Sequence, residues 1–432
     1  MPETRVTLPR FLGPVGATLL IVTYAVGTAI FLVPGIIARD AGSAGASIAL
    51  WIAGGLLIFC GSLCYAELAV RVPKSGAEYR YLYAGFGPPL AFVFAWTSLF
   101  AQPVAIAAVA RGFADYLAEI WPMQEALRRA AGAAAIVAFA AVSMRSTPAA
   151  MRVAGVAAVG KILALLTLAA IGIAAVPAAA PPAIVAPSSG GSAIQWLGAM
   201  VAIIWAFDGF SSVATLAGEV RDPRRTLPLS LFAGIGIVTL IYVTTNLVYF
   251  RVLGFAGVAA SDAVAASVLQ AVIGPAGANV IAALVMASAL GSLAAQMVGN
   301  PRYFLGPAED GLFPARLAAI SPRTLTPANA ILFTAAIAIG LVTIGGYELL
   351  IRLYVLSYFP MTIIALFAAV RLRRRDGVPQ GFAMPLYPLP LVVYGVGILG
   401  VCIASAIGDP AGALFGLMVP VTGALVYRLK FR

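Results

Sequence analysis

Long apolar runs divide this 432-residue chain, and most of them have the roughly 20 residues that a helix needs to cross a bilayer. Lipid cannot satisfy open backbone groups, so a continuously apolar run spans only as a helix. The sequence therefore predicts an all-α integral membrane protein with about twelve transmembrane helices. The runs cover 12–37, 45–70, 87–113, 130–144, 153–176, 195–219, 229–252, 278–301, 327–346, 350–370, 387–407 and 411–428.

Composition excludes several other classes of protein. Charged residues make up only 10% of the chain, whereas soluble domains carry about 25%. The net charge is +11, but the basic residues lie singly or in short clusters between apolar runs, so we expect no nucleic-acid partner. Histidine is absent, which excludes histidine-dependent catalysis and histidine-ligated zinc. We expect no metal site, no cofactor and no enzymatic activity.

The distribution of basic residues predicts the orientation. Twelve spans place both termini on one side of the membrane. That side holds about twenty Lys and Arg residues and the other side about six, so the positive-inside rule places both termini in the cytoplasm. The first apolar run is longer than the core of a cleaved signal peptide. We therefore expect a multi-pass protein of the plasma (inner) membrane.

The first and sixth runs share an interruption at the same depth. Gly27 and Thr28 lie in AVGTAIFLVPG, and Asp208 and Gly209 lie in WAFDGFSSVATLAGE. The two runs are five spans apart, and an odd number gives two halves of opposite topology. Paired interrupted helices in inverted halves indicate a binding site at the repeat interface. The alternative is that the small residues only let helices pack closely.

Two ionisable residues lie at membrane depth. Lys161 follows eight residues after the start of the fifth run, and Asp208 lies in the middle of the sixth. Intramembrane charges are costly and mark functional sites by default. The alternatives are that Lys161 snorkels to the surface and that Asp208 caps a helix break. Asp208 is otherwise a candidate to carry a proton or to meet a substrate amine.

Two glutamines and three cysteines also lie within the apolar runs. Gln102 and Gln296 either line a cavity or hydrogen-bond a neighbouring helix. The cysteines are Cys60, Cys64 and Cys402, and none lies in a loop.

Several segments resemble the amino acid–polyamine–organocation (APC) superfamily, and within it the L-type amino acid transporter-like exchangers. The most specific is CYAELAVRVPKSGAEYRYL at 64–82, which is similar to the second-helix signature of that family. The others are GTAIFLVPG at 27–35, WAFDGF at 205–210 with GEVRDPRRTLP at 218–228, and the segment 302–330. The likeness runs in family order from about residue 12 to residue 330.

The resemblance implies a LeuT-like fold of two inverted five-helix halves, spans 1–5 and 6–10, plus two peripheral helices. The expected units are a cytoplasmic N-terminus at 1–11, a first repeat at 12–176, a Pro/Ser/Gly-rich external loop at 177–194, a second repeat at 195–371, and peripheral helices with a cytoplasmic C-terminus at 372–432.

The resemblance also implies a substrate site. Backbone N–H groups of the first break would receive a substrate carboxylate, as half-helix N-termini attract anions, and carbonyls of both breaks would receive the amine. Trp205 would act as a gate, and Lys161 would replace a sodium ion between spans 1 and 8. The implied substrate-binding residues are Ala25, Gly27, Thr28, Ala29, Ile30, Gln102, Trp205, Phe207, Asp208, Gly209 and Gln296.

Two features depart from the family pattern. Ala29 stands where the family usually has glycine, and its methyl group narrows the space for a carboxylate and favours a small substrate. The loop cysteine that links some relatives to a partner subunit has no counterpart, so no obligate disulfide-linked subunit is expected.

The sequence therefore predicts a sodium-independent amino acid transporter that works by alternating access, as an exchanger or a proton symporter. Asp208 motivates the alternative of a polyamine or organic-cation transporter with the same fold. A membrane sensor, a membrane enzyme or a channel is the remote alternative.

Overall fold

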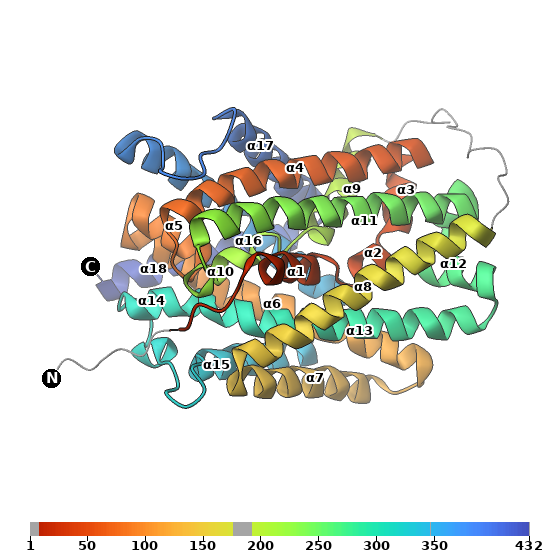
Figure 1. Ribbon diagram of the computed structural model, residues 1–432, viewed down its shortest axis with the longest axis horizontal. Helices are drawn as coiled ribbons and strands as arrows, with labels where there is room; N and C mark the ends of the chain where they lie inside the picture. The colour runs from red at the N-terminus through yellow and green to blue at the C-terminus, as the bar shows by residue number, and fades with distance from the viewer. Residues whose placement is uncertain (1–7, 176–191, 346, 432) are drawn as a thin grey trace.

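A computed structural model describes residues 8–175, 192–345 and 347–431. Within these ranges the chain forms a bundle of long helices lying side by side, without any β-strand (Figure 1). Residues 1–7 of the predicted N-terminal segment and most of the predicted external loop, 177–191, lie outside the described residues.

Nine helices of the described part are long and apolar enough to cross a membrane. They are α4 (Ala44–Arg71), α6 (Pro88–Ile120), α7 (Glu125–Arg145), α8 (Thr147–Ala175), α11 (Pro223–Ala260), α13 (Ala276–Gly299), α16 (Tyr347–Asp376), α17 (Leu389–Gly408) and α18 (Pro410–Phe431).

The other three predicted spans are a short helix and two broken ones. The ninth, α15 (Ala328–Ile344), is apolar and 17 residues long. The first is divided into α1 (Pro14–Ala25), α2 (Ala29–Leu32) and α3 (Pro34–Ala41), and the sixth into α9 (Ala193–Ala206) and α10 (Ser212–Thr215). The predicted all-α membrane fold is therefore confirmed, and nine of the twelve predicted spans are single helices long and apolar enough to cross a membrane in the described part of the chain.

Two short helices mark the inverted relation of the halves. α5 (Ala77–Phe86) follows the second span, and α12 (Val264–Ile273) follows the seventh, the equivalent place in the second half. The two lie at opposite ends of the bundle (Figure 1). This is the placement that inverted topology requires. The remaining short elements are α14 (Leu305–Glu309) and the 3₁₀ turns Ala217–Glu219, Asn300–Phe304 and Ala315–Ala318.

Local sequence explains where several helices begin. The Ser43 side chain accepts a hydrogen bond from the Ala46 N–H and caps α4. Ser192 and Gln195 form a reciprocal capping box, which starts α9 two residues before the predicted boundary at 195.

Glycine makes the break in the sixth span possible. Gly209 has φ of 91°, a conformation that other residues rarely adopt. A Cβ atom at this position would lie 2.6 Å from the Tyr24 Cβ atom. The first span therefore packs directly on the backbone of the sixth at their two breaks.

Both chain termini lie at one end of the bundle, here called the terminal end (Figure 1). A buried ion pair closes it: Arg302 Nε lies 2.5 Å from Glu219 Oε1, and neither side chain is more than 1% exposed. Arg302 also donates to Thr147 at the start of α8. Residues 11 and 12 donate their backbone N–H groups to the Glu219 carbonyl. This end therefore joins three spans and the N-terminal segment.

Arg302→Met should destabilise the protein strongly, because it leaves the Glu219 carboxylate buried without a partner. The expected loss is about 3–5 kcal/mol, read as a lowered melting temperature in detergent. The double variant Arg302→Met/Glu219→Gln should recover part of that loss, since it removes both charges. Arg375→Met, which breaks an exposed ion pair with Asp376, is the control and should change little. Equal melting temperatures for Arg302→Met and Arg375→Met would contradict this account.

Candidate functional site at the two broken helices

Lys161 lies at the break of the first span and is 5% exposed. Its ammonium donates to the Val26 carbonyl at 2.7 Å, the Thr23 carbonyl at 3.1 Å and the Ser292 hydroxyl at 2.8 Å. A lysine ammonium has three donors, so all three are used. The carbonyls belong to the C-terminal end of α1, where the helix dipole favours a cation.

Two serines on α13 hold the same break. Ser292 donates to the Thr23 carbonyl at 2.8 Å, and Ser288 lies 3.2 Å from the carbonyls of Val26 and Gly27. The break is therefore fixed between α8, which carries Lys161, and α13. Unwound carbonyls and half-helix C-terminal ends of this kind can coordinate a cation inside a membrane protein.

A tyrosine of α11 connects the two broken spans. The Tyr242 hydroxyl lies 2.7 Å from the carbonyl oxygens of Ala25 and Ala206, the last residues of α1 and α9. These carbonyls lack intrahelical partners because each helix ends there. The hydroxyl has one proton, so it donates to one carbonyl at a time and ties both helix ends to α11.

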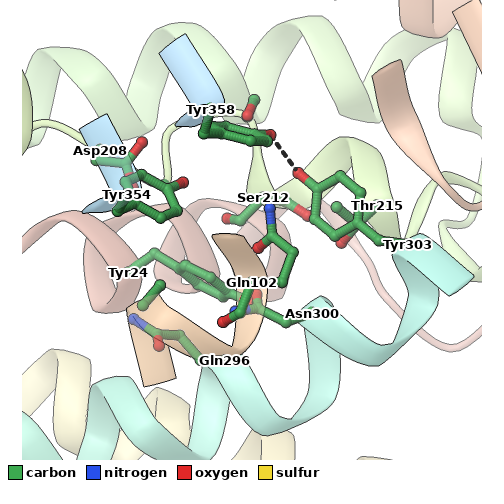
Figure 2. Close-up of a pocket in the computed structure, with 13 residues that line it drawn as sticks. Tyr24, Gln102, Asp208, Ser212, Thr215, Gln296, Asn300, Tyr303, Tyr354 and Tyr358 are labelled. Carbon is green, nitrogen blue, oxygen red and sulfur yellow. Dashed lines mark hydrogen bonds between the residues drawn. The ribbon is translucent and has the colours of Figure 1, made fainter. Parts of the chain in front are cut away.

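A small polar cavity lies beside the break in the sixth span (Figure 2). Its volume of about 30 Å³ has room for roughly two water molecules. Four predicted site residues line it: Gln102, Asp208, Gly209 and Gln296. The structure therefore brings together side chains from α6, the sixth-span break and α13.

Three buried polar atoms around this cavity make no hydrogen bond within the described part of the protein. They are Gln102 Nε2, Gln296 Oε1 and Ser212 Oγ. All three residues line the cavity (Figure 2 shows them together). A buried polar group without a partner is costly, so these atoms are suited to bind water or a polar ligand.

Asp208 and Trp205 both meet Tyr354 of α16. The Tyr354 hydroxyl interacts with the Asp208 carboxyl, and Figure 2 shows the two side by side. The Trp205 ring packs edge-on against the Tyr354 ring, with centroids 5.5 Å apart. Trp205 is not among the residues that line the small cavity.

The other predicted site residues surround the breaks without lining this cavity. Ala25, Thr28, Ala29 and Ile30 are all buried, with Ala29 and Ile30 in the first turn of α2. A Cβ atom at Gly27 would make an ordinary van der Waals contact with Ser292 Oγ, at 3.9 Å.

Phe207 lies in an aromatic cluster next to the sixth-span break. Its ring packs against Tyr242 with centroids 5.0 Å apart, and against Trp51 at 6.4 Å. It is 1% exposed. Phe207 therefore does not line the cavity.

Sequence reasoning missed most of the hydroxyl groups in the cavity wall. Tyr354 and Tyr358 are four apart on α16, which is a usable signal of one polar stripe in an apolar span. The other missed lining residues include Tyr24, Ser212, Thr215, Asn300 and Tyr303. The described residues contain no group of three His, Cys, Asp or Glu side chains that could hold a metal ion.

Comparison with known proteins finds full-length relatives. The chain is similar to the serine/threonine exchanger of Bacillus subtilis, with 24% identity over 97% of this chain and 96% of that protein. It is also similar to two Mus musculus proteins, each with 28% identity over 98% of this chain. They are the b(0,+)-type amino acid transporter 1, covered over 88% of its length, and the large neutral amino acids transporter small subunit 2, covered over 81%.

The family model for amino acid permeases matches residues 12–424, which includes the spans described above except the last seven residues of α18. The two broken spans, the polar cavity between them and this match lead to one conclusion: the chain is a multi-pass membrane transporter that belongs to the amino acid permease family.

Proposed function

We propose that this permease moves small or neutral amino acids across the plasma membrane by alternating access, without using sodium. Both termini would lie in the cytoplasm, as the excess of basic residues on their side favours. The terminal end of the bundle would then be the cytoplasmic end.

The observation that carries the proposal is the Lys161 ammonium between α1 and α13. It donates to two carbonyls of the broken span and to Ser292, all within 3.1 Å. A sodium ion needs oxygen ligands of this kind, and here a fixed positive charge already occupies their centre. We infer that the protein needs no sodium to hold the break in shape, and that Lys161 takes the role of the ion.

An amino acid zwitterion fits the ends of the broken helices. Its carboxylate would approach the first turn of α2, near Gly27, Thr28, Ala29 and Ile30, because half-helix N-termini favour anions. Its amine would meet carbonyls near Ala25, Trp205 and Asp208. The side chain would face Gln102, Gln296 and Gly209, where Gln102 Nε2 and Gln296 Oε1 have no hydrogen-bond partner among the described residues.

Two observations favour a small substrate. Ala29 is 4% exposed at the start of α2 and adds a methyl group there. One similar protein is called a serine/threonine exchanger. Another similar protein is called a large neutral amino acids transporter, so a transport panel has to include larger neutral amino acids.

Transport requires that the two ends of the bundle open in turn. At the terminal end, the Arg302–Glu219 pair would have to part. At the opposite end, Arg39 of α3 contacts Asp262 before α12 and donates to the Ala259 carbonyl at 2.8 Å.

Trp205, whose ring packs edge-on against Tyr354, would act as a gate that moves when substrate binds. Asp208 and Lys161 are candidate proton carriers within the spans themselves if transport is proton-coupled.

A transport assay in liposomes tests the proposal. The purified protein is reconstituted, and uptake of labelled alanine, serine, threonine, leucine and lysine is measured with and without unlabelled amino acid inside. Stimulation by internal amino acid would establish exchange. Uptake into empty liposomes that rises with an inward proton gradient would establish symport. A protein that takes up no amino acid in either condition would overturn the proposal.

The second candidate is a polyamine or organic-cation transporter of the same fold. Asp208 favours it, because this carboxyl lines the cavity and is suited to meet an amine. Competition separates the two candidates: putrescine should not displace labelled alanine if the first proposal is right, and alanine should not displace labelled putrescine if the second is.

Lys161→Ala should reduce the transport rate by more than about tenfold, because each hydrogen bond to a charged group is worth about 1.5–3 kcal/mol. The variant should still fold, which gel filtration in detergent checks. Lys430→Ala, at an exposed lysine near the end of α18, is the control. Normal uptake by Lys161→Ala would remove Lys161 from the mechanism.

Ala29→Gly should widen the substrate range. Removing the methyl group should shift the preference between alanine and leucine toward leucine by up to about tenfold, the scale of one methylene in a pocket. The ratio of their inhibition constants measures this, with exposed Ala134→Gly on α7 as the control. An unchanged ratio would show that Ala29 does not limit substrate size.

A further inference from the structure

Glu78 is a fully buried carboxyl near the cavity. It lies in the first turn of α5, a helix outside the membrane-spanning set, and is 0% exposed. Its Oε1 atom accepts from the Tyr65 hydroxyl at 2.8 Å and the Tyr358 hydroxyl at 3.0 Å, and lies 3.5 Å from the Ser211 hydroxyl. Its Oε2 atom has no hydrogen-bond partner in the described part of the protein.

Glu78 differs from the other two buried glutamates because no arginine pairs with it in the described part of the chain. Glu67 and Glu219 are also 0% exposed, but arginines neutralise both: Arg71 and Arg373 contact Glu67, and Arg302 contacts Glu219. No ion pair within the described ranges involves Glu78. Arg80, the nearest arginine along the chain, turns instead toward Glu309 and Asp310.

The titratable groups that face Glu78 bring no positive charge. From its own helix and the neighbouring spans they are tyrosines, and from the sixth-span break there is one further carboxyl. They are Tyr81 of α5, Tyr65 of α4, Tyr303 after α13, Tyr354 and Tyr358 of α16, Tyr394 of α17, and Asp208.

An ionised carboxylate in such a place is costly, because burial without a cation costs several kcal/mol. Burial raises the pKa of the Glu78 carboxyl, although its own backbone N–H and the tyrosine hydroxyls act in the opposite direction. Protonation at Oε1, the atom that faces Tyr358, removes the charge: the acid can then donate to the Tyr358 hydroxyl while Oε1 still accepts from Tyr65. The buried surroundings of Glu78 in this structure therefore favour the protonated acid.

Glu78 contacts both a residue of the cavity wall and the helices around the sixth-span break. Its contacts join α5 to α4, to α16 and to Ser211 in the sixth-span break. Tyr358 lies 3.0 Å from the Tyr303 hydroxyl, and both tyrosines line the cavity (Figure 2). A proton can pass from cavity water to Tyr303, then Tyr358, then Glu78, as each hydroxyl accepts one proton and releases another.

We propose that Glu78 binds a proton that the permease carries together with its substrate. The proton reaches Glu78 from the cavity while the end opposite the termini is open, and it allows the terminal end to close around an uncharged acid. When the terminal end opens, water reaches the carboxyl, which ionises and releases the proton on that side. The inference rests on the proposed transport function, and it selects symport with one proton per substrate.

The test compares Glu78→Gln with the wild-type protein in liposomes, with alanine as the probe. Glutamine is nearly isosteric and stays uncharged, so it imitates the protonated acid. In empty liposomes with an acidic exterior, the wild-type protein should accumulate alanine up to about tenfold per pH unit of gradient. Glu78→Gln should keep counterflow driven by internal alanine, but its accumulation ratio should fall to about one. Glu119→Gln, at an exposed glutamate of α6, is the matched control and should behave as the wild type.

The outcomes of this experiment distinguish a failure of the proposed transport function from a failure of the proposed role of Glu78. Absence of both counterflow and gradient-driven uptake in the wild-type protein, for every amino acid of the panel, would overturn the proposed function itself. Wild-type counterflow without accumulation in a proton gradient, or undiminished accumulation by Glu78→Gln, would overturn only the role of Glu78.

Tyr65→Phe serves as a second variant if Glu78→Gln yields too little folded protein. It removes a donor that favours the charged carboxylate, so the pKa of Glu78 should rise. The pH at which uptake is half-maximal should then move upward. An unchanged midpoint in this variant would also contradict the proposal.

Discussion

The arrangement at the centre of the bundle depends on one buried ammonium. The broken first span leaves carbonyl groups without helical partners inside a membrane, where lipid cannot satisfy them. Lys161 donates to two of these carbonyls, those of Thr23 and Val26, and to Ser292, whose hydroxyl donates in turn to the Thr23 carbonyl. Its charge is stabilised in turn by the end of the α1 dipole. Without the ammonium, the break and the helices packed on it would lose their common anchor.

The other constraints build outward from this anchor. Tyr242 ties the ends of α1 and α9 to α11, so the two broken spans share one support. The Arg302–Glu219 pair then joins the segment after α10 to the end of α13 and closes the terminal end. The cavity lies between the break and this ion pair. Its amide and hydroxyl atoms that lack a partner among the described residues are suited to bind water or a polar ligand. Glu78 lies beside it as the one fully buried glutamate of the described chain without an arginine.

Much of this could be predicted from the sequence, because the signals are local. Run length and hydropathy predicted the spans, and paired glycines with polar neighbours predicted the two breaks. The depth of Lys161 in its run predicted a functional role without any knowledge of its hydrogen-bond partners. The roles of Tyr242 and Glu78 could not be predicted, since their partners lie far along the chain. The sequence also could not predict which way the Phe207 side chain points, because an irregular segment has no helical periodicity that assigns residues to a face.

The most direct test of the central claim is the sodium dependence of transport by the wild-type protein. Counterflow of labelled alanine is measured in liposomes with sodium, potassium or choline as the only monovalent cation on both sides. If Lys161 occupies the place of a sodium ion, the three initial rates should be equal within error. A rate that appears only with sodium, and that saturates as sodium is added, would contradict the account.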